Sequence, residues 1–268
     1  MSQYKAWIDG QIHAVESSLT SSVQQLEYIY EKPLKGTSVL VFGSGFGGSS
    51  VALALKGAKI YGVDIAQNSI KIAQKRAIEH NLAEDIAFIC LEDTTNLHFP
   101  DSYFDIVTCD AVLEHIVGDR TCYLKEMWRV LKKKGILYIS NTPNILYPYD
   151  SHVTNLFLLP WMSAKTAKKY ALLRKKCLPS DNLELMGRRG MTFWSIMRAL
   201  KKENYMLIST SRQCNLITYM LERKRINTKK KKILFPLLFV LNYVIALPLN
   251  IPVSALLPDL TFIALQKN

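Results

Sequence analysis

The stretch VLVFGSGFGGSSVALALKG, residues 39–57, decides the fold, because an apolar strand pattern runs into a glycine-rich turn and then into a helix pattern. Gly43, Gly45 and Gly48 match the G-x-G-x-x-G spacing of dinucleotide-binding turns. Gly43, Gly45 and Gly47 match a second spacing, G-x-G-x-G, which suits a nucleoside without a pyrophosphate. So many glycines at a strand-to-helix turn favour close approach of the backbone to a ligand over a purely structural turn.

Strands and helices alternate outward from this turn. The sequence predicts strands at 38–42, 59–65, 86–91, 104–109 and 136–140 and helices at 49–57, 68–81 and 120–135. A lead-in helix ends at Pro33, and a further helix and strand occupy 192–205 and 206–211. The lysines at 132–134 are expected to complement the dipole at the end of their helix. This alternation is typical of an α/β protein, in which ligands bind at the carboxyl ends of parallel strands.

The charge of the chain is uneven. Its 268 residues carry a net charge of +12, yet residues 1–150 are slightly acidic and residues 151–232 are strongly basic. This asymmetry indicates an anionic partner, which is a membrane surface, a nucleic acid or a phosphorylated substrate. Five cysteines without C-x-x-C spacing argue against a disulfide framework or a zinc site and fit a reducing cytosol.

Two acidic residues follow predicted strands close to the glycine turn. Asp64 ends the second strand, where an ionised carboxylate can accept both hydroxyls of a ribose. Asp93 lies just past the third strand, where an acceptor can take the amino group of an adenine. Asp64 fits NAD and S-adenosylmethionine equally, since both carry an adenosine ribose.

Five segments in order resemble the class I S-adenosylmethionine-dependent methyltransferases, in the branch that includes ubiquinone-biosynthesis-type enzymes. The segments are VLVFGSGFG, YGVDI, CLEDTTNL, FDIVTCDAVLEHI and WRVLKKKGILYISNTPN, within residues 35–145. The resemblance implies a Rossmann-like α/β fold with a mostly parallel, seven-stranded sheet and helices on both faces. It also implies S-adenosylmethionine as the cofactor and methyl transfer as the reaction.

The resemblance carries the cofactor site onto specific positions. The residues expected to bind S-adenosylmethionine are Gly43, Ser44, Gly45, Gly47, Asp64, Ile65, Asp93, Thr94 and Asp110. One position departs from the family, because Val41 stands where an acid usually helps to anchor the methionine amino group. That anchor is then expected to come from backbone carbonyls near Gly43 and from Asp110.

A base is useful if the acceptor is a hydroxyl. His115 in VLEHI and His152 in YPYDSHVTN are the candidate catalytic residues, with Asp110 as a further possible base, and no metal site is expected. For His115 the alternative is that it caps and supports a helix together with Glu114. For His152 the alternative is a solvated loop residue, although Tyr147, Tyr149 and Asp150 could orient it.

The expected organisation surrounds this core with two less regular parts. The expected segments are an N-terminal helix (1–34), the cofactor-binding core (35–150), a basic helical insertion acting as a lid (151–190), a continuation of the core (191–232), an apolar helical segment (233–258) and a closing strand (259–268). The apolar segment follows four lysines, is broken by Pro236 and Pro248, and precedes the closing strand. A helical hairpin in one leaflet of a membrane fits these features, and a buried subdomain or dimer interface is the alternative.

The expected function is O-methylation of a small-molecule, lipid or lipid-linked acceptor, such as a polyprenyl-quinone precursor or a surface-glycan intermediate. The protein is expected in the cytoplasm, peripheral on the inner face of an anionic membrane. RNA methylation and a non-catalytic, methyltransferase-like scaffold stay open as alternatives, the latter because of Val41. The sequence leaves the oligomeric state open.

Overall fold

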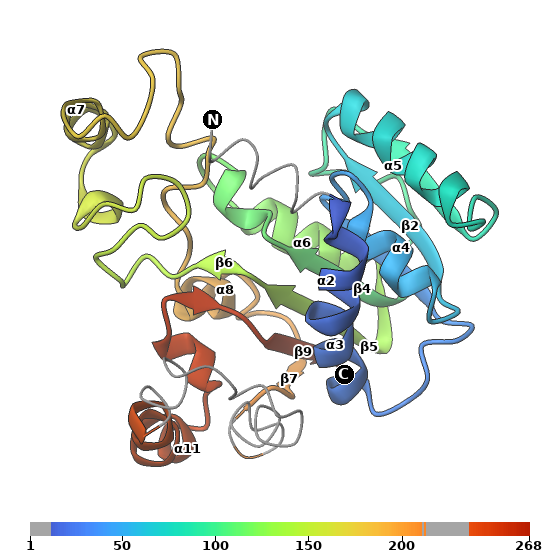
Figure 1. Cartoon of the computed structure of the whole chain (residues 1–268). Coiled ribbons are helices and arrows are strands. Elements are labelled where there is room, and N and C mark those ends of the chain that lie inside the picture. Colours follow the sequence, from blue (N-terminus) through green and yellow to red (C-terminus); the bar gives the residue numbers. More distant parts are fainter. Residues whose placement is uncertain (1–11, 211, 213–235) are drawn as a thin grey trace. The chain divides into compact units, whose positions relative to one another are not determined.

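A computed structural model describes residues 12–210, 212 and 236–268 (Figure 1). Its principal helices are α2 (Ala14–Thr20), α3 (Ser22–Tyr30), α4 (Gly48–Ala54), α5 (Gln67–Glu79), α6 (Thr121–Arg129), α7 (Ala164–Leu173) and α8 (Phe193–Ala199). Its longer strands are β1 (Ser38–Phe42), β2 (Lys59–Asp64), β3 (Ile86–Cys90), β4 (Phe104–Asp110), β5 (Leu131–Ser140), β7 (Tyr205–Leu207) and β9 (Ile263–Lys267). The alternation of strands and helices predicted from the sequence is therefore confirmed.

These seven strands form one sheet in the order β3-β2-β1-β4-β5-β9-β7. β1 pairs in parallel with β2 and with β4, and β2 pairs in parallel with β3. The strand order reverses direction at β1 and β4, which is where open α/β sheets bind ligands. The predicted Rossmann-like fold class, with its seven-stranded and mostly parallel sheet, is confirmed.

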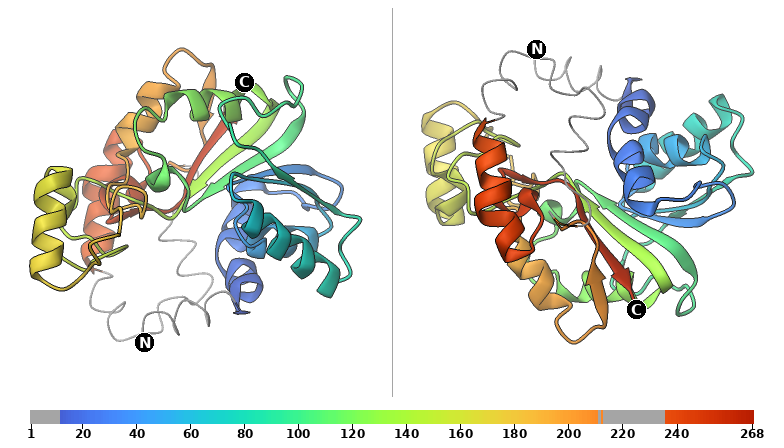
Figure 2. Two further views of the ribbon diagram at one scale, coloured as in Figure 1. Left: turned by 90° about the horizontal axis from the view of Figure 1, so that it is seen from above. Right: turned by 90° about the horizontal axis from the view of Figure 1, so that it is seen from below.

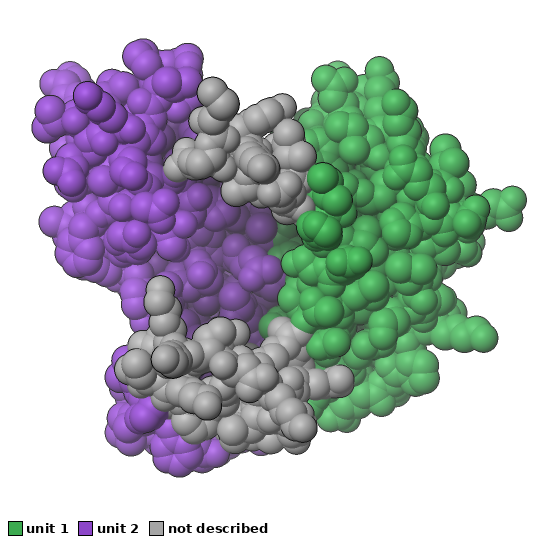
Figure 3. Space-filling view, viewed as in Figure 1, with its two compact units in different colours: residues 1–110, 125–138, 265–268 green, residues 111–124, 139–264 purple. Residues whose placement is uncertain are grey.

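The chain divides into two compact units (Figure 3). Unit 1 comprises residues 1–110, 125–138 and 265–268, and unit 2 comprises residues 111–124 and 139–264. Within unit 1, α2 and α3 pack against α4, the helix that follows the glycine turn, as Figures 1 and 2 show. Val23, Leu26 and Ile29 of α3 are buried, as their helical spacing predicts.

Unit 2 holds the insertion and the C-terminal apolar segment. The insertion has a small core of its own, made by Leu156, Leu159, Ala167, Ala171 and Leu183. A short antiparallel pair joins β6 (Thr142–Pro143) to β8 (Asp259–Leu260), in a register that places Pro143 opposite Asp259. The insertion also contacts the short 3-10 helix η1 (Leu113–His115), because Leu185 O lies 2.8 Å from His115 Nδ1.

The predicted helix 120–135 is wrong in its second half, because α6 ends at Arg129 and Leu131 already belongs to β5. The carbonyls that would continue the helix have other partners. Ser102 N donates to Arg129 O at 3.0 Å, and Lys267 Nζ donates to the carbonyls of Trp128 and Leu131 at 2.8 Å each. The lysines at 132–134 lie on a strand, so their predicted role at a helix dipole is also wrong.

The apolar segment is a single helical stretch where a hairpin had been expected. Residues 236–249 are helical, including a π-helical turn at Leu241–Ala246, and a 3-10 helix at Val253–Leu256 leads to β8 and β9. Pro248 lies near the C-terminal end of this stretch, in the short segment α11 (Leu247–Leu249). Among the described residues, no helix combines the length and the apolar character that crossing a membrane requires. The lysine run 229–232 lies outside the described residues.

Candidate functional site

The glycine turn of unit 1 has the conformation that its sequence predicts. Gly43, Gly45 and Gly47 have φ values of 72°, 50° and 79°, in the left-handed region that glycine adopts without strain. A Cβ at Gly47 would lie 2.9 Å from the Cβ of Ala73, so that glycine is also required by packing. A Cβ at Gly45 would meet nothing within 4 Å, so the backbone at this point borders open space.

Asp64 is fixed against this turn at the end of β2. Its Oδ2 accepts a hydrogen bond from Gly45 N at 2.8 Å, and its Oδ1 accepts one from Ala66 N at 2.9 Å. Each carboxylate oxygen can accept more than one hydrogen bond, so these two bonds hold the Asp64 carboxylate in place and its oxygens can still bind two hydroxyls. The next residue, Ile65, is 64% exposed and offers an apolar surface beside the carboxylate. This combination fits the ribose and base of an adenosine.

The other residues expected at the cofactor lie around the same strand ends. Asp93 is exposed and its Oδ1 accepts hydrogen bonds from Thr95 N at 2.8 Å and Thr95 Oγ1 at 2.6 Å. The hydroxyl of Thr95 contributes most to lowering the pKa of Asp93, which keeps that group an acceptor. Thr94 and Ser44 are buried, and the Ser44 hydroxyl finds no hydrogen-bond partner among the described residues. A buried hydroxyl without a partner at the turn fits a bound polar ligand.

Asp110 ends β4 and lies against the N-terminal helices. Its Oδ2 accepts a hydrogen bond from Ser22 Oγ of α3 at 2.9 Å, and both residues line a small pocket together with Thr108 and Tyr138. Val41 is 3% exposed inside β1, so its side chain offers no polar contact to a ligand. The use of Asp110 as a substitute anchor stays a prediction.

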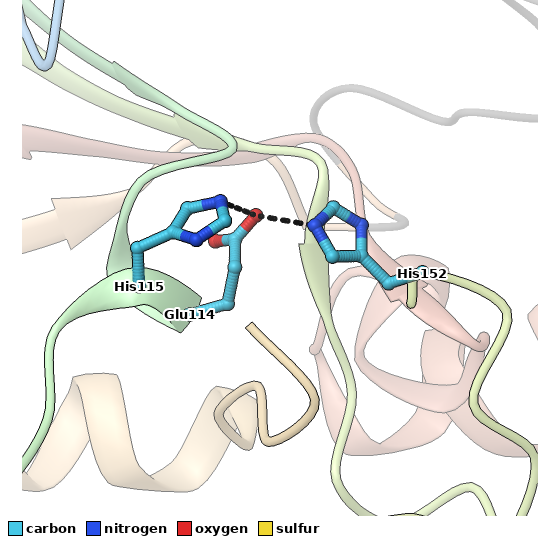
Figure 4. A group of neighbouring side chains, drawn as sticks. All are labelled: Glu114, His115 and His152. Carbon is cyan, nitrogen blue, oxygen red and sulfur yellow. Dashed lines mark ion pairs between the residues drawn. The ribbon is translucent and has the colours of Figure 1, made fainter. Parts of the chain in front are cut away.

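Unit 2 brings together the two histidines that sequence analysis singled out (Figure 4). His115 follows Glu114 on the 3-10 turn, and His152 comes from the loop after β6; the ring centroids are 5.7 Å apart. The Nε2 atom of each histidine lies 3.9 Å from the same carboxylate oxygen, Oε1 of Glu114. Glu114 is 0% exposed, whereas the histidine side chains are 44% and 32% exposed. We call this group the histidine centre.

The protonation of the histidine centre is constrained by its surroundings. Nδ1 of His115 lies 2.8 Å from the carbonyl oxygen of Leu185, which can only accept, so Nδ1 carries the proton. The lone pair of the neutral His115 ring is then on Nε2, facing Glu114. Burial, followed by repulsion from His115, lowers the pKa of His152, against the attraction of Asp150 and Asp259. His152 is therefore neutral at neutral pH and able to accept a proton.

The expected supports of the histidines are partly corrected. Asp150 does not hold the ring of His152; its Oδ1 accepts from the backbone N–H of His152 at 3.1 Å and so shapes the loop. Tyr147 donates to Leu256 O and Tyr149 donates to Asn155 Oδ1, so neither hydroxyl orients His152. The capping alternative for His115 is also wrong, because its ring is bonded to Leu185 in another segment.

Two further residues of this site, Gly187 and Asp259, were not predicted from the sequence. Gly187 has φ +87°, and a Cβ there would lie 2.8 Å from Glu114 Cγ and 3.2 Å from atoms of both histidine rings. Asp259 is half-buried on β8 and interacts electrostatically with His152; burial raises the pKa of Asp259. A usable signal for Asp259 existed, since it is the first charged residue after the long uncharged run that begins at Ile233.

The ligand atoms of Glu114, His115 and His152 lie within 4.8 Å of one another, so this group also has the donor set and spacing that could hold a metal ion. Two chemistries are therefore open to it: proton transfer by a neutral histidine, or coordination of a divalent cation through two imidazoles and a carboxylate. Neither alternative had been expected for Glu114 itself.

Comparison with known proteins agrees with this geometry. Residues 40–139 match the family model described as "Methyltransferase domain". A ubiquinone biosynthesis O-methyltransferase of Actinobacillus pleuropneumoniae is 34% identical over 131 residues, which are 47% of this chain and 55% of that protein. One of Paracidovorax citrulli is 29% identical over 171 residues, covering 62% and 71%. The chain spans about half the length of most of the curated relatives it matches.

Among solved structures, an S-adenosylmethionine-dependent methyltransferase of Methanococcus maripaludis superimposes with a TM-score of 0.50 at 19% identity. The match covers 76% of this chain and 85% of that one, and at this identity it speaks for the fold. The YcgJ protein of Bacillus, also at a TM-score of 0.50, covers 85% of this chain and 84% of its own. The segment matched by the family model contains the glycine turn, Asp64, Asp93 and Asp110, and over this segment the chain is similar to S-adenosylmethionine-dependent methyltransferases.

Proposed function

We propose that the protein transfers a methyl group from S-adenosylmethionine to a hydroxyl of a lipid or lipid-linked acceptor. The observation that carries the choice of a hydroxyl is the histidine centre. A hydroxyl is a weak nucleophile until its proton is removed, so an O-methyltransferase benefits from a base. Two histidines converging on one buried carboxylate, with one ring neutral at neutral pH, supply such a base.

Roles within unit 1 follow from the fit of its residues to the cofactor. S-adenosylmethionine supplies a methyl group that its sulfonium already activates, so positioning accounts for much of the rate. Asp64 would accept the ribose hydroxyls, and Asp93 with Thr94 would lie at the adenine. The remaining part of the cofactor would lie beside Ser44 and the backbone of Gly43, Gly45 and Gly47. Asp110 would hold the methionine amino group in place of the missing acid at Val41.

Roles within unit 2 concern the acceptor. His152 Nε2 would take the hydroxyl proton while the acceptor oxygen bonds to the methyl carbon and the carbon–sulfur bond breaks. Glu114 would stabilise the imidazolium that forms, and His115, fixed by Leu185, would add a second acceptor.

A lipid-linked acceptor is favoured by an exposed apolar ridge on the helical stretch 236–249. The exposed side chains on this stretch are Leu237, Phe239, Val240, Tyr243, Val244, Ile245 and Leu249. The stretch carries no charge and follows four lysines in the sequence, a combination that suits the interface of an anionic membrane. The insertion adds an exposed Trp161 and the basic helix α7, in which Lys165 and Lys169 are exposed.

The acceptor class is tested by incubating the protein with methyl-labelled S-adenosylmethionine and either a total lipid extract or total RNA. We expect label in the lipid fraction, in a species that is stable to mild base as an ether is. Label in RNA alone would favour the RNA methyltransferase. No label in either, together with intact cofactor binding, would favour the non-catalytic scaffold.

The same assay separates the two chemistries of the histidine centre. Base catalysis predicts that a chelator leaves transfer unchanged. Loss of transfer with the chelator, and its recovery with a divalent cation, would instead make Glu114, His115 and His152 cation ligands.

Membrane association is tested by flotation with vesicles of anionic and neutral lipids. We expect flotation with anionic vesicles, weakened by salt, and we expect Val244→Asp to reduce it without changing the affinity for S-adenosylmethionine. Asn250→Asp, just beyond the ridge, adds the same charge as a control. A protein that ignores vesicles of every charge would contradict the peripheral membrane proposal.

A further inference from the structure

We propose that Arg120 is a positioning residue of the histidine centre: its guanidinium fastens the turn that carries Glu114 and His115 to residues 189–190. The inference deepens the proposed function, and its catalytic consequence rests on that function. The geometric part stands on the contacts of unit 2 alone.

The side chain of Arg120 donates hydrogen bonds to three backbone carbonyls. Nε donates to Ile116 O at 3.0 Å, Nη1 donates to Gly190 O at 2.9 Å and Nη2 donates to Arg189 O at 3.0 Å. Ile116 directly follows η1, so the first bond holds the end of the turn that bears Glu114 and His115. The other two bonds reach a segment about 70 residues further along the chain. A planar guanidinium presents its N–H donors in a fixed fork, whereas a lysine ammonium presents its donors from one freely rotating atom.

The segment that Arg120 holds touches every member of the histidine centre. Leu185 supplies the carbonyl that sets the tautomer of His115, and Gly187 packs against Glu114, His115 and His152 without room for a Cβ. A displacement of this segment would therefore move the acceptor of the Nδ1 proton and the packing surface of both rings together.

Other contacts fix the segment to β6 and to the insertion, so its links to the turn are the side chain of Arg120 and the hydrogen bond between His115 Nδ1 and Leu185 O. Met191 N donates to Pro143 O at 2.9 Å, and the carbonyl of Pro143 lies so close to Gly190 that a Cβ there would be 1.5 Å from it. Arg188, which is buried, donates to Leu159 O at 2.9 Å and to Met162 O at 3.1 Å. These contacts bind the segment to β6 and to the insertion, whereas the side chain of Arg120 binds it to η1.

Arg120 also interacts electrostatically with the buried carboxylate of the histidine centre. Glu114 is wholly buried, and the Coulomb attraction between it and Arg120 opposes the lowering of the Arg120 pKa by burial. Glu184 acts on Arg120 in the same direction and Arg189 in the opposite one. Arg120 thus places a positive charge near the carboxylate on which the histidines converge, and a buried carboxylate needs such compensation.

The test uses Arg120→Gln and, as a matched control, Arg198→Gln on the exposed face of α8. Each protein is labelled with nitrogen-15 in its five histidines and titrated by proton–nitrogen NMR, which distinguishes the two neutral tautomers. In the natural protein we expect His115 in the Nδ1–H tautomer. In Arg120→Gln we expect that preference to be lost and the titration of His152 to move. Arg198→Gln should leave both histidines unchanged.

A folded Arg120→Gln protein whose His115 tautomer and His152 titration match the natural protein would overturn the proposal. If Arg120→Gln does not fold, Arg120→Lys decides the matter, because it keeps the charge and the long stem but loses the fork; the expected result is again a mixed His115 tautomer, and an unchanged one overturns the proposal.

Methyl transfer gives the second readout. We expect Arg120→Gln to lower kcat by up to about 100-fold through misplacement of the histidines, with the dissociation constant of S-adenosylmethionine unchanged. The NMR readout needs no acceptor. Histidines that respond while kcat does not would confirm the positioning and contradict the catalytic role of the centre in the proposed function.

Discussion

The residues of unit 1 that are expected to bind the cofactor and the histidine centre of unit 2 are assembled in different ways. The residues expected at the cofactor follow one another along residues 43–110, each at or just after the end of a strand, because neighbouring parallel strands end at the same edge of a sheet. The histidine centre joins residues 114–115 to residue 152 and to the backbone at 185–187. The first arrangement can be read from periodicity and spacing, whereas the second depends on how an insertion packs. Sequence signals can therefore predict the first group, whereas the second is seen only in the folded chain.

The largest expected effect comes from removing the base. His152→Ala should lower the rate of methyl transfer by about 100- to 10,000-fold, the usual contribution of a general base, with S-adenosylmethionine affinity unchanged. Steady-state kinetics with the labelled lipid acceptor measure the rate. His98→Ala, a change at an exposed histidine of unit 1, is the control. A His152→Ala enzyme of full activity would remove this residue from the mechanism.

A smaller effect is expected from pH. The pKa of His152 lies below its ordinary value of about 6.5, so the residue is a competent base at neutral pH and is protonated only under more acidic conditions. The transfer rate should be level near neutral pH and fall by about tenfold per pH unit below the lowered pKa. A rate that still rises steeply above pH 7 would show that another group with a higher pKa takes the proton.

Two glycines of unit 2 separate backbone strain from crowding at the histidine centre. Gly187 and Gly118 have φ values of +87° and +93°, but only Gly187 has close neighbours. Alanine at either position should cost about 1 kcal/mol of unfolding free energy through the backbone. Gly187→Ala should cost about 1–3 kcal/mol more, because the new methyl group displaces Glu114 and the rings. Urea unfolding measures both, and equal losses would contradict the crowding.

The smallest effect tests the corrected end of α6. On β5, Lys132 Nζ lies 2.9 Å from Asp105 Oδ1, while the neighbouring Lys133 is exposed. Lys132→Met should therefore lower the unfolding free energy by about 0.2–1 kcal/mol, the range for a partly exposed ion pair. Lys133→Met should change it less. Similar effects of both substitutions would fit a helix dipole better than a strand.

The sequence predicts the fold well because its signals are local. The apolar pattern of β1, the glycines after it and Asp64 at the end of β2 each depend on a few neighbouring residues. The end of α6 could not be predicted in this way. It depends on Lys267, which lies 136 residues beyond Leu131 and takes its carbonyl.

The candidate site shows the same limit. His115 and His152 could be named from their motifs, but nothing local indicates that both rings converge on Glu114, nor that Gly187 makes room for them. The expected orientation by Asp150 failed because an aspartate in a turn bonds more readily to the backbone N–H groups that follow it. These long-range contacts form only when the insertion packs, so local sequence does not predict them.

Calorimetric titration with S-adenosylmethionine tests most directly the central claim, that unit 1 binds the cofactor and that the histidine centre of unit 2 does not. The account predicts that the natural protein binds the cofactor despite Val41. It predicts that Asp64→Ala weakens binding by about 10- to 150-fold, from the loss of hydrogen bonds to a charged group worth about 1.5–3 kcal/mol. It also predicts that His152→Ala binds as the natural protein does. Equal affinity of the natural protein and a folded Asp64→Ala, or binding that appears only in Val41→Asp, would contradict the account.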